Sequence, residues 1–239
     1  MRSDILTANS PLFAPKPRRR EVRDPYDGLR PWSAITHGAG AVLAAAGAVA
    51  LLLRAAGQGK WLSFVLFLIY GLSMVGLYTA STLYHCLNIS VAGRIALRKY
   101  DHCSIYLLIA GSYTPICMTA LRENGGPALL ACVWALAAAG LVLTIAKLEI
   151  PRWLTSTIYL MMGWLAIFAI VPLYRALPPA GFALLLAGGL SYTVGGVLYA
   201  VKWPGRNNPR FGCHEIFHLF ILLGSIFHFI LMYRVVAWL

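Results

Sequence analysis

The sequence predicts an all-α membrane protein, a bundle of seven transmembrane helices with a cytoplasmic amino terminus and a carboxyl terminus outside. The first supporting observation is composition: 59% of the residues are hydrophobic, only 12% are charged, and the mean hydropathy is +0.71. These values lie far outside the soluble range. The second observation is spacing, because the few charged residues leave long uncharged runs between them. A helix needs about 20 mainly apolar residues to cross a bilayer, so each run is a candidate span.

Seven uncharged runs are long enough to cross. They are 31–53, 61–93, 102–121, 124–146, 153–174, 176–201 and 216–233. The second run exceeds one span, and Asn88, Ser90 and Gly93 indicate that its last third is a loop. Residues 31–239 are therefore predicted to form one seven-helix transmembrane domain.

Small residues and tryptophans support this division into helices. The first and sixth runs carry small residues at spacings that allow close helix contact. These are Gly38, Gly40, Ala44 and Gly47 in the first run, and Gly188, Gly189, Ser191, Gly195 and Gly196 in the sixth. Tryptophans fall at the predicted helix ends, where indole rings favour the membrane interface. They are Trp32, Trp61, Trp153, Trp203 and Trp238.

The first thirty residues differ in character from the rest of the chain. They contain four prolines and the run Arg18-Arg19-Arg20, without the apolar segment of a cleaved signal peptide. We predict that residues 1–30 form a disordered basic cytoplasmic tail that lies against anionic headgroups.

The distribution of Lys and Arg sets the predicted orientation. When the seven runs are threaded alternately through the membrane, the amino-terminal side collects 15 of the 20 Lys and Arg residues. Such residues are in excess on the cytoplasmic side, so the amino terminus is predicted inside. The ends of the runs that carry Ser81, His85, Asp101, His214 and His218 then all face the cytoplasm.

The formal charge of +12 does not indicate a nucleic-acid partner. The basic residues are spread over several loops, and no module that combines basic and aromatic residues is present. The expected partners are membrane lipids and a metal ion, and no feature of the sequence indicates an oligomeric state. The five cysteines include no CxxC pair and are expected to be free packing residues.

The polar residues at the inner ends of the helices are the candidate site, because such side chains are costly near lipid and are normally kept for function. His214 and His218 are four residues apart, hence on one helical face, and this spacing can bind one metal ion. The alternative is a pair of interfacial histidines that hydrogen-bond to headgroups. His85 could supply a third nitrogen, with Ser81 one turn earlier. Three histidines with an open position are typical of catalytic zinc, although a lone His85 could also be an interior histidine with its hydrogen bonds satisfied.

Two acids lie at the same level. Asp101 could accept a proton from a water at the metal, or it could form an ion pair with Arg98 or Lys99. Glu215 follows His214 by about 100° around the helix, and the residue at this place is the base in soluble zinc proteases. His228 lies about 20 Å deeper by helical rise, too far for the same ion.

Together these residues resemble the hemolysin III family, bacterial relatives of the progestin and adiponectin receptors. The matching segments are Ser81-Thr82-Leu83-Tyr84-His85, Asp101-His102 leading to Ile109-Ala110-Gly111-Ser112-Tyr113-Thr114-Pro115, and His214-Glu215-Ile216-Phe217-His218. Thr36-His37-Gly38 and Phe227-His228-Phe229 also match. The sequence departs from the family at Arg30 and Ser33, where an acid and an asparagine are usual.

The resemblance implies a seven-helix bundle in the bacterial cytoplasmic (inner) membrane, with zinc held by His85, His214 and His218. Asp101 and Ser81 fall where the family holds the water at the zinc. Relatives in the wider superfamily, including alkaline ceramidases, hydrolyse lipid amides, and bacterial members are linked to membrane-lipid homeostasis. The chain is thus expected to be a zinc-dependent lipid-amide hydrolase, with Asp101 and Ser81 as the catalytic pair.

Two other functions are weighed against the hydrolase. A membrane-state sensor could use zinc only to hold helices together, with Asp101 as a fourth ligand. A haemolytic pore-former, which the family's name suggests, is disfavoured because a chain with seven spans cannot easily be released and inserted into a target membrane.

Overall fold

The computed structural model describes residues 29–146, 152–205 and 211–239. The predicted tail therefore lies outside the described residues except for its last two, Leu29 and Arg30. The described part is helical, with no β-strand. Its helices are α1 (Pro31–Gly57), α2 (Trp61–Cys86), α3 (Val91–Met118), α4 (Gly126–Ile145), α5 (Arg152–Trp164), η3 (Leu165–Ala169), α6 (Ile170–Ala176), α7 (Pro179–Val201), α8 (Cys213–Arg234) and η4 (Val236–Trp238).

Six helical segments of the described chain are long and apolar enough to cross a membrane. They are Pro31–Gly57, Trp61–Cys86, Gly126–Ile145, Leu154–Ala176, Pro179–Val201 and Cys213–Trp238. The remaining long helix, α3, is less apolar: it carries charged residues in its first half and the polar run Ser112-Tyr113-Thr114 in its second. The chain is a membrane protein, and α3 is the part of the predicted seven-helix pattern that apolarity alone does not support.

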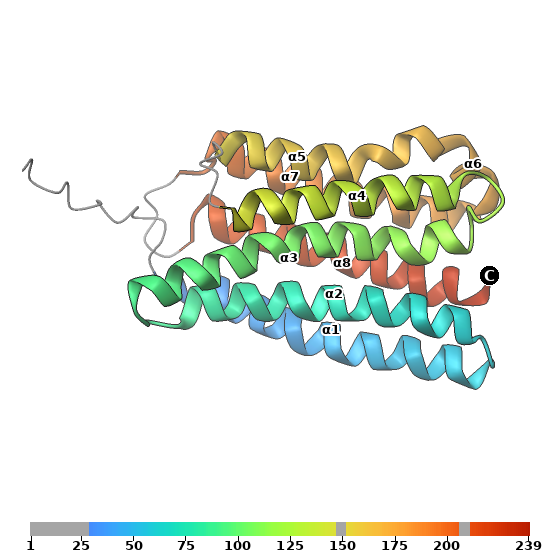
Figure 1. Ribbon diagram of the computed structural model, residues 1–239, viewed down its shortest axis with the longest axis horizontal. Helices are drawn as coiled ribbons and strands as arrows, with labels where there is room; N and C mark the ends of the chain where they lie inside the picture. The colour runs from blue at the N-terminus through green and yellow to red at the C-terminus, as the bar shows by residue number, and fades with distance from the viewer. Residues whose placement is uncertain (1–28, 147–151, 206–210) are drawn as a thin grey trace, which may run out of the picture.

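The helices lie side by side and alternate in direction (Figure 1). α1 packs against α2 and α8, α2 against α3, α3 against α4 and α5, and α7 against α5 and α8. These contacts close into a ring, with α4 outside it against α3. α1, α3 and α8 begin at one end of the bundle, where α2 ends, and the C-terminus lies at the opposite end (Figure 1). The topology therefore brings the ends of α2, α3 and α8 that carry the candidate residues to one place.

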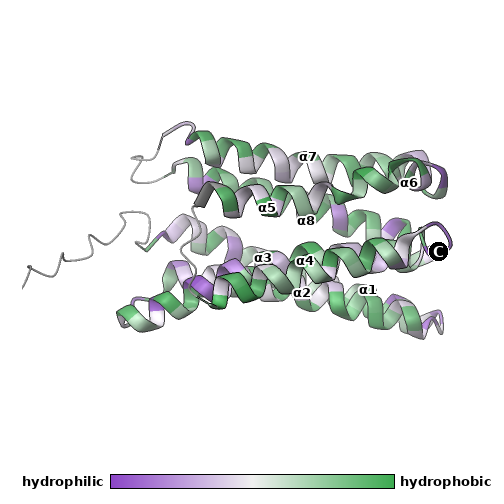
Figure 2. Cartoon of the chain, turned by 45° about the horizontal axis from the view of Figure 1, so that its top comes forward, coloured by the Kyte–Doolittle hydropathy of each residue, from purple (hydrophilic) through white to green (hydrophobic). Residues whose placement is uncertain are grey.

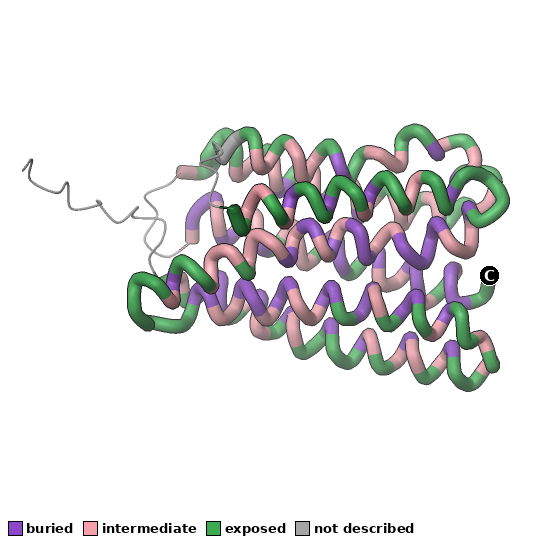
Figure 3. Tube along the Cα trace, viewed as in Figure 1, coloured by how far each residue is buried: buried purple, intermediate pink, exposed green. Residues whose placement is uncertain are grey.

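Apolar and polar side chains are distributed as lipid requires. Large hydrophobic residues such as Val42 and Phe168 are exposed on the outside, and Figure 2 shows hydrophobic colour along the helices with hydrophilic residues concentrated near the ends. Buried residues of α2 and α3 follow the faces that meet other helices (Figure 3). Several buried residues are polar, including three histidines below 4% exposure, His37, His85 and His218. The interior is thus where function is to be sought.

The predicted start of the third helix was wrong, because charged residues were taken as the limits of helices. The uncharged run begins at residue 102, whereas α3 begins at Val91, with Ser90 as a hydroxyl cap that accepts a bond from the Gly93 amide. Arg94 is buried inside this helix because its guanidinium donates to the carbonyls of Tyr84 and Leu87 at the end of α2. The arginine thus satisfies carbonyls that a helix end leaves unpaired.

The sequence predicted one regular helix for the fifth run, but the structure breaks it into α5, η3 and α6. The Tyr113 hydroxyl of α3 lies at the break: it donates toward the carbonyl of Gly163 at 2.6 Å and accepts from the Ala166 amide at 2.8 Å. A side chain thus replaces backbone bonds that the break removes, which is the condition for irregular backbone at membrane depth.

Candidate metal centre

The first turn of α8 holds two of the three candidate ligands. His214 and His218 stand one turn apart on this helix, with ring centroids 4.5 Å from each other. The turn is held by Glu215, whose Oε2 accepts the Gly212 amide at 2.9 Å. This bond satisfies a donor at the helix start and fixes the position from which both imidazoles project.

His85, in the last turn of α2, faces this pair. Its ring centroid is 4.9 Å from that of His214 and 5.0 Å from that of His218. The Nε2 atoms of His85 and His214 are 3.2 Å apart, and one ligand nitrogen from each of the three residues lies within 4.8 Å of the others. Two helices that are distant in sequence therefore bring the three predicted metal ligands together.

The arrangement fits a zinc ion. Two nitrogens bound at about 2.05 Å to a tetrahedral ion would be about 3.3 Å apart, close to the separation of the two Nε2 atoms. Imidazole nitrogens suit zinc among the common metals. Within the described residues the group consists of three histidines, and three protein ligands are common in catalytic zinc sites, whereas structural sites usually have four.

Asp101 and Ser81 lie beside this group and interact with each other. Ser81 is 2% exposed and one helical turn before His85, and its side chain hydrogen-bonds to the Asp101 carboxylate. Both residues line the same cavity as His214 and His218. The sequence predicted Asp101 at the start of its helix, but the residue lies inside α3. Its carboxylate faces Ser81 of α2.

Glu215 is placed differently from the base of a zinc protease. Its Oε1 accepts bonds from Arg30 at 2.8 Å and from the Ser33 hydroxyl at 3.3 Å, while its Oε2 accepts the Gly212 amide. With both oxygens engaged, Glu215 ties α1 to the start of α8 and is not available as a base. Arg30, assigned to the tail by sequence, is instead the N-cap residue of α1 and the ion-pair partner of this carboxylate.

His37 has a larger part in the site than its sequence position indicated. Its ring stacks on that of His218, with centroids 3.7 Å apart and an interplanar angle of 20°. It also meets the ring of Tyr78 edge to face. The stacking restricts how His218 can rotate. The Thr-His-Gly segment in the first run was the signal that pointed to this residue.

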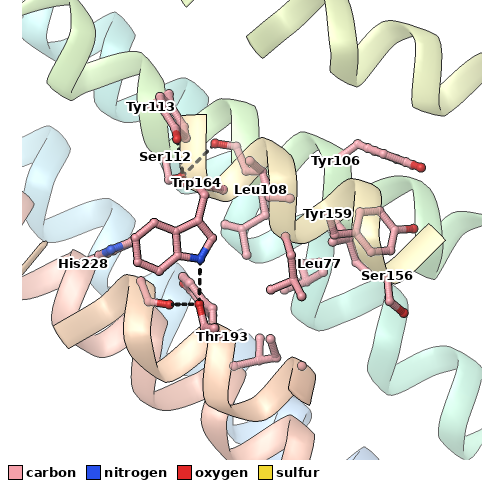
Figure 4. A pocket seen from close by; sticks show the side chains of 18 of the residues that line it. Leu77, Tyr106, Leu108, Ser112, Tyr113, Ser156, Tyr159, Trp164, Thr193 and His228 are labelled. Carbon is pink, nitrogen blue, oxygen red and sulfur yellow. Dashed lines mark hydrogen bonds between the residues drawn. The ribbon is translucent and has the colours of Figure 1, made fainter. Parts of the chain in front are cut away.

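A cavity of about 940 Å³ extends into the bundle from His214 and His218. It begins at Ser81, Asp101, His214 and His218 and continues between α3, α5, α7 and α8 to His228. Figure 4 shows Trp164 in this cavity, donating to Thr193, with His228 on one side and Tyr159 and Ser156 on the other. His228 does not belong to the group of metal ligands, and it lies at the deeper part of the same space.

The model of the family described as Haemolysin-III related matches residues 31–229. Hemolysin-3 of Bacillus cereus is 40% identical over 197 residues, which cover 82% of this chain and 87% of that protein. A hemolysin-3 homolog of Bacillus subtilis (strain 168) is 41% identical over 205 residues, which cover 85% of this chain and 93% of the relative. The family model covers the helices that carry every candidate ligand, so the chain belongs to the haemolysin-III-related family, as its sequence motifs predicted.

Proposed function

We propose that this membrane protein is a zinc-dependent hydrolase of lipid amide bonds that acts in lipid homeostasis in the bacterial inner membrane. The observation that carries the proposal is the convergence of three histidine nitrogens, without a carboxylate in their group, at the mouth of a large cavity. Lipid-facing helices surround that cavity, so a substrate could arrive from the bilayer.

The proposal includes α3 as a seventh span, with residues 1–30 cytoplasmic and Leu239 outside. α3 packs between α2 and α4, both of which are apolar enough to cross. Its polar residues face partners within the bundle. The Thr114 hydroxyl accepts a bond from Trp134, and the Tyr113 hydroxyl bonds to the Gly163 carbonyl at the break between α5 and η3. A helix whose polar groups are satisfied by neighbours can cross lipid despite lower apolarity.

His85, His214 and His218 would hold the zinc. The ion, when bound, supplies Lewis acidity to the scissile carbonyl and makes a nearby water easier to deprotonate. Asp101 accepts the proton of the attacking water and passes it to the leaving amine nitrogen. Ser81 keeps the carboxylate in place through its hydrogen bond.

The cavity would hold the acyl chain while the amide lies at the histidines. Its walls are mainly apolar and aromatic, with Leu77, Leu108 and Trp164 among the lining residues. Sites of this size and character bury most of a lipid-sized ligand. The amide would therefore be fixed at one end by the site and at the other by the chain.

Substitution of Asp101 tests the chemistry. Asp101→Asn keeps the size but removes the proton acceptor, so amide turnover should fall by at least a hundredfold while zinc content stays at that of the wild type. Turnover is measured as release of fatty acid from N-acyl lipids by purified zinc-loaded protein in vesicles. Wild-type rates in Asp101→Asn, or no turnover by fully loaded wild type, would contradict the mechanism.

The absence of turnover by fully zinc-loaded wild type would favour a membrane-state sensor in which zinc only joins helices. In that case the three histidines would serve to join α2 to α8, the two helices that carry them. Haemolysis, which the relatives' names mention, is a third outcome: release of haemoglobin from red cells by the purified chain would support it.

Fusions after Leu239 test the topology. Alkaline phosphatase there should be active and green fluorescent protein dark if the carboxyl end is outside. A fluorescent fusion would overturn the seven-span model and favour an even number of spans.

A further inference from the structure

A second polar cluster lies deep in the bundle, between α2, α7 and α8. The Tyr78 hydroxyl donates to Ser225 at 2.8 Å, and the hydroxyls of Tyr192 and Ser225 are 3.0 Å apart. The rings of Tyr192 and His228 meet edge to face, with centroids 5.4 Å apart. None of these residues belongs to the group of metal ligands, and the proposed chemistry uses none of them.

This cluster leaves hydrogen-bonding capacity unused, and two of its residues, Tyr192 and His228, line the cavity. His228 is 91% buried, being 9% exposed, and its Nε2 lies 3.3 Å from the Leu185 carbonyl, which can only accept. Nε2 is thus the protonated nitrogen, and Nδ1 is an acceptor with no partner. If Tyr192 donates to Ser225 it keeps free lone pairs, and if it accepts it keeps its own proton. Both residues line the cavity.

Two glycines hold these side chains in place. A Cβ added at Gly188 of α7 would overlap the imidazole of His228, and one at Gly224 of α8 would overlap the ring of Tyr192. Each ring therefore fits against the backbone of the facing helix. The free acceptor and the hydroxyl are rigidly positioned, which lowers the entropic cost of binding a partner.

The cavity connects this cluster to the metal-binding group along α7 and α8. On α7, lining residues recur at the spacing of one helical face: Leu185, Gly189, Tyr192, Gly196 and Tyr199. On α8 the lining runs from His214 and His218 through Ile221 to His228. At 1.5 Å per residue, His228 is about 15 Å beyond His218 and about 21 Å beyond His214. An extended chain gains about 1.2 Å per bond, so about 12 to 17 bonds span the distance.

We propose that His228 and Tyr192 form a binding site for a hydroxyl group carried on the chain of a long-chain lipid, about 12 or more bonds from its polar linkage. The ligand hydroxyl donates to His228 Nδ1 and exchanges a second hydrogen bond with Tyr192. The proposal rests on the cavity's role as an acyl-chain site, stated above. It adds that this protein prefers lipids with a polar group far along the chain.

The test is a binding experiment with zinc-loaded protein in micelles. Competitors displace a fluorescent fatty acid: an unsubstituted 18-carbon acid, an isomer hydroxylated next to the carboxyl group, and one hydroxylated about 12 carbons away. The last should bind about fivefold to tenfold more tightly than the unsubstituted acid, as one or two hydrogen bonds would give. The isomer hydroxylated beside the carboxyl group should gain nothing.

Two variants give a matched comparison. Tyr192→Phe removes a hydroxyl that lines the cavity and should abolish the preference. Tyr78→Phe removes a hydroxyl bonded to the same Ser225, but its ring is not part of the cavity lining, so it should keep the preference. His228→Phe removes the free acceptor and should act as Tyr192→Phe does.

Equal affinity of the three acids for the wild type would overturn the inference, and would mean that a water fills the space beside His228. Equal loss in Tyr192→Phe and Tyr78→Phe would also overturn it. A position-dependent preference in a protein that turns over no amide would uphold the hydroxyl site and refute the hydrolase. Amide turnover without the preference would do the reverse.

Discussion

The two polar clusters along α8, the three histidines at the mouth of the bundle and the deeper group around Ser225, differ in the kinds of polar atoms that meet. At the mouth of the bundle, the Nε2 atoms of His85 and His214 are 3.2 Å apart and a third histidine is near. Deeper, hydroxyl groups bond to one another, as in the bond from Tyr78 to Ser225, and Nδ1 of His228 has no partner. A bound cation would let all three imidazoles direct a lone pair to one point, whereas hydroxyl groups can bond to one another through their own protons. The same helix thus carries two of the proposed metal ligands at one level and part of a hydrogen-bond network at another.

The largest expected effect separates the clusters by metal content. His85→Ala, His214→Ala and His218→Ala should each lower zinc from about one per chain to near zero, and should lower the melting temperature as well, because metal-binding energy is also folding energy. His228→Ala should keep its zinc. Metal analysis with thermal unfolding of the purified variants checks this, and full occupancy in two of the three ligand variants would rule out the site.

A smaller effect, on the free energy of unfolding, is expected from the Arg30–Glu215 ion pair beside the proposed metal ligands. Arg30→Met leaves the Glu215 carboxylate, 4% exposed on its side chain, without its charged partner. Removal of one partner from a buried pair costs about 3 kcal/mol, measured as a loss of unfolding free energy in micelles. The double variant Arg30→Met/Glu215→Gln should recover most of this loss, because no buried charge remains. If Arg30→Met alone is as stable as wild type, the pair does not hold α1 to α8.

The smallest effect concerns the deeper cluster. Gly188→Ala forces a methyl group into the His228 imidazole and should cost about 2 kcal/mol through overpacking, with zinc content unchanged. Gly189→Ala is the matched control, because nothing lies within 4 Å of a Cβ added there, and it should be neutral. Loss of zinc in Gly188→Ala would mean that the two clusters are coupled rather than independent.

Much of this arrangement could be predicted from the sequence, since the spacing of the charged residues identified where most helices lie. His85, His214 and His218 were recognised because histidine is unusual near lipid and the spacing on α8 is that of a metal pair. The start of α3 was missed because charges were treated as helix limits, whereas Arg94 is buried by capping α2.

Other features depend on contacts between distant segments that no local pattern encodes. The engagement of Glu215 by Arg30 and Ser33 joins residues about 180 positions apart. The break between α5 and η3 lies within an uncharged run of the sequence. The backbone groups freed at this break bond to the Tyr113 hydroxyl, which belongs to a different helix, α3. The stacking of His37 on His218 likewise follows from the way that α1 packs against α8.

The break at η3 has a consequence for how relatives can diverge. The cavity has one wall on α2 and α8, which carries Ser81, His214 and His218, and another formed by α5 and η3, where the regular backbone pattern is already interrupted. Substitutions on the second wall, near Gly163 and Trp164, would change the shape of the cavity without displacing His214 or His218. Under the proposed function, variation in lipid preference among members of the family should therefore accumulate on α5 and η3, while the wall of α2 and α8 stays constant.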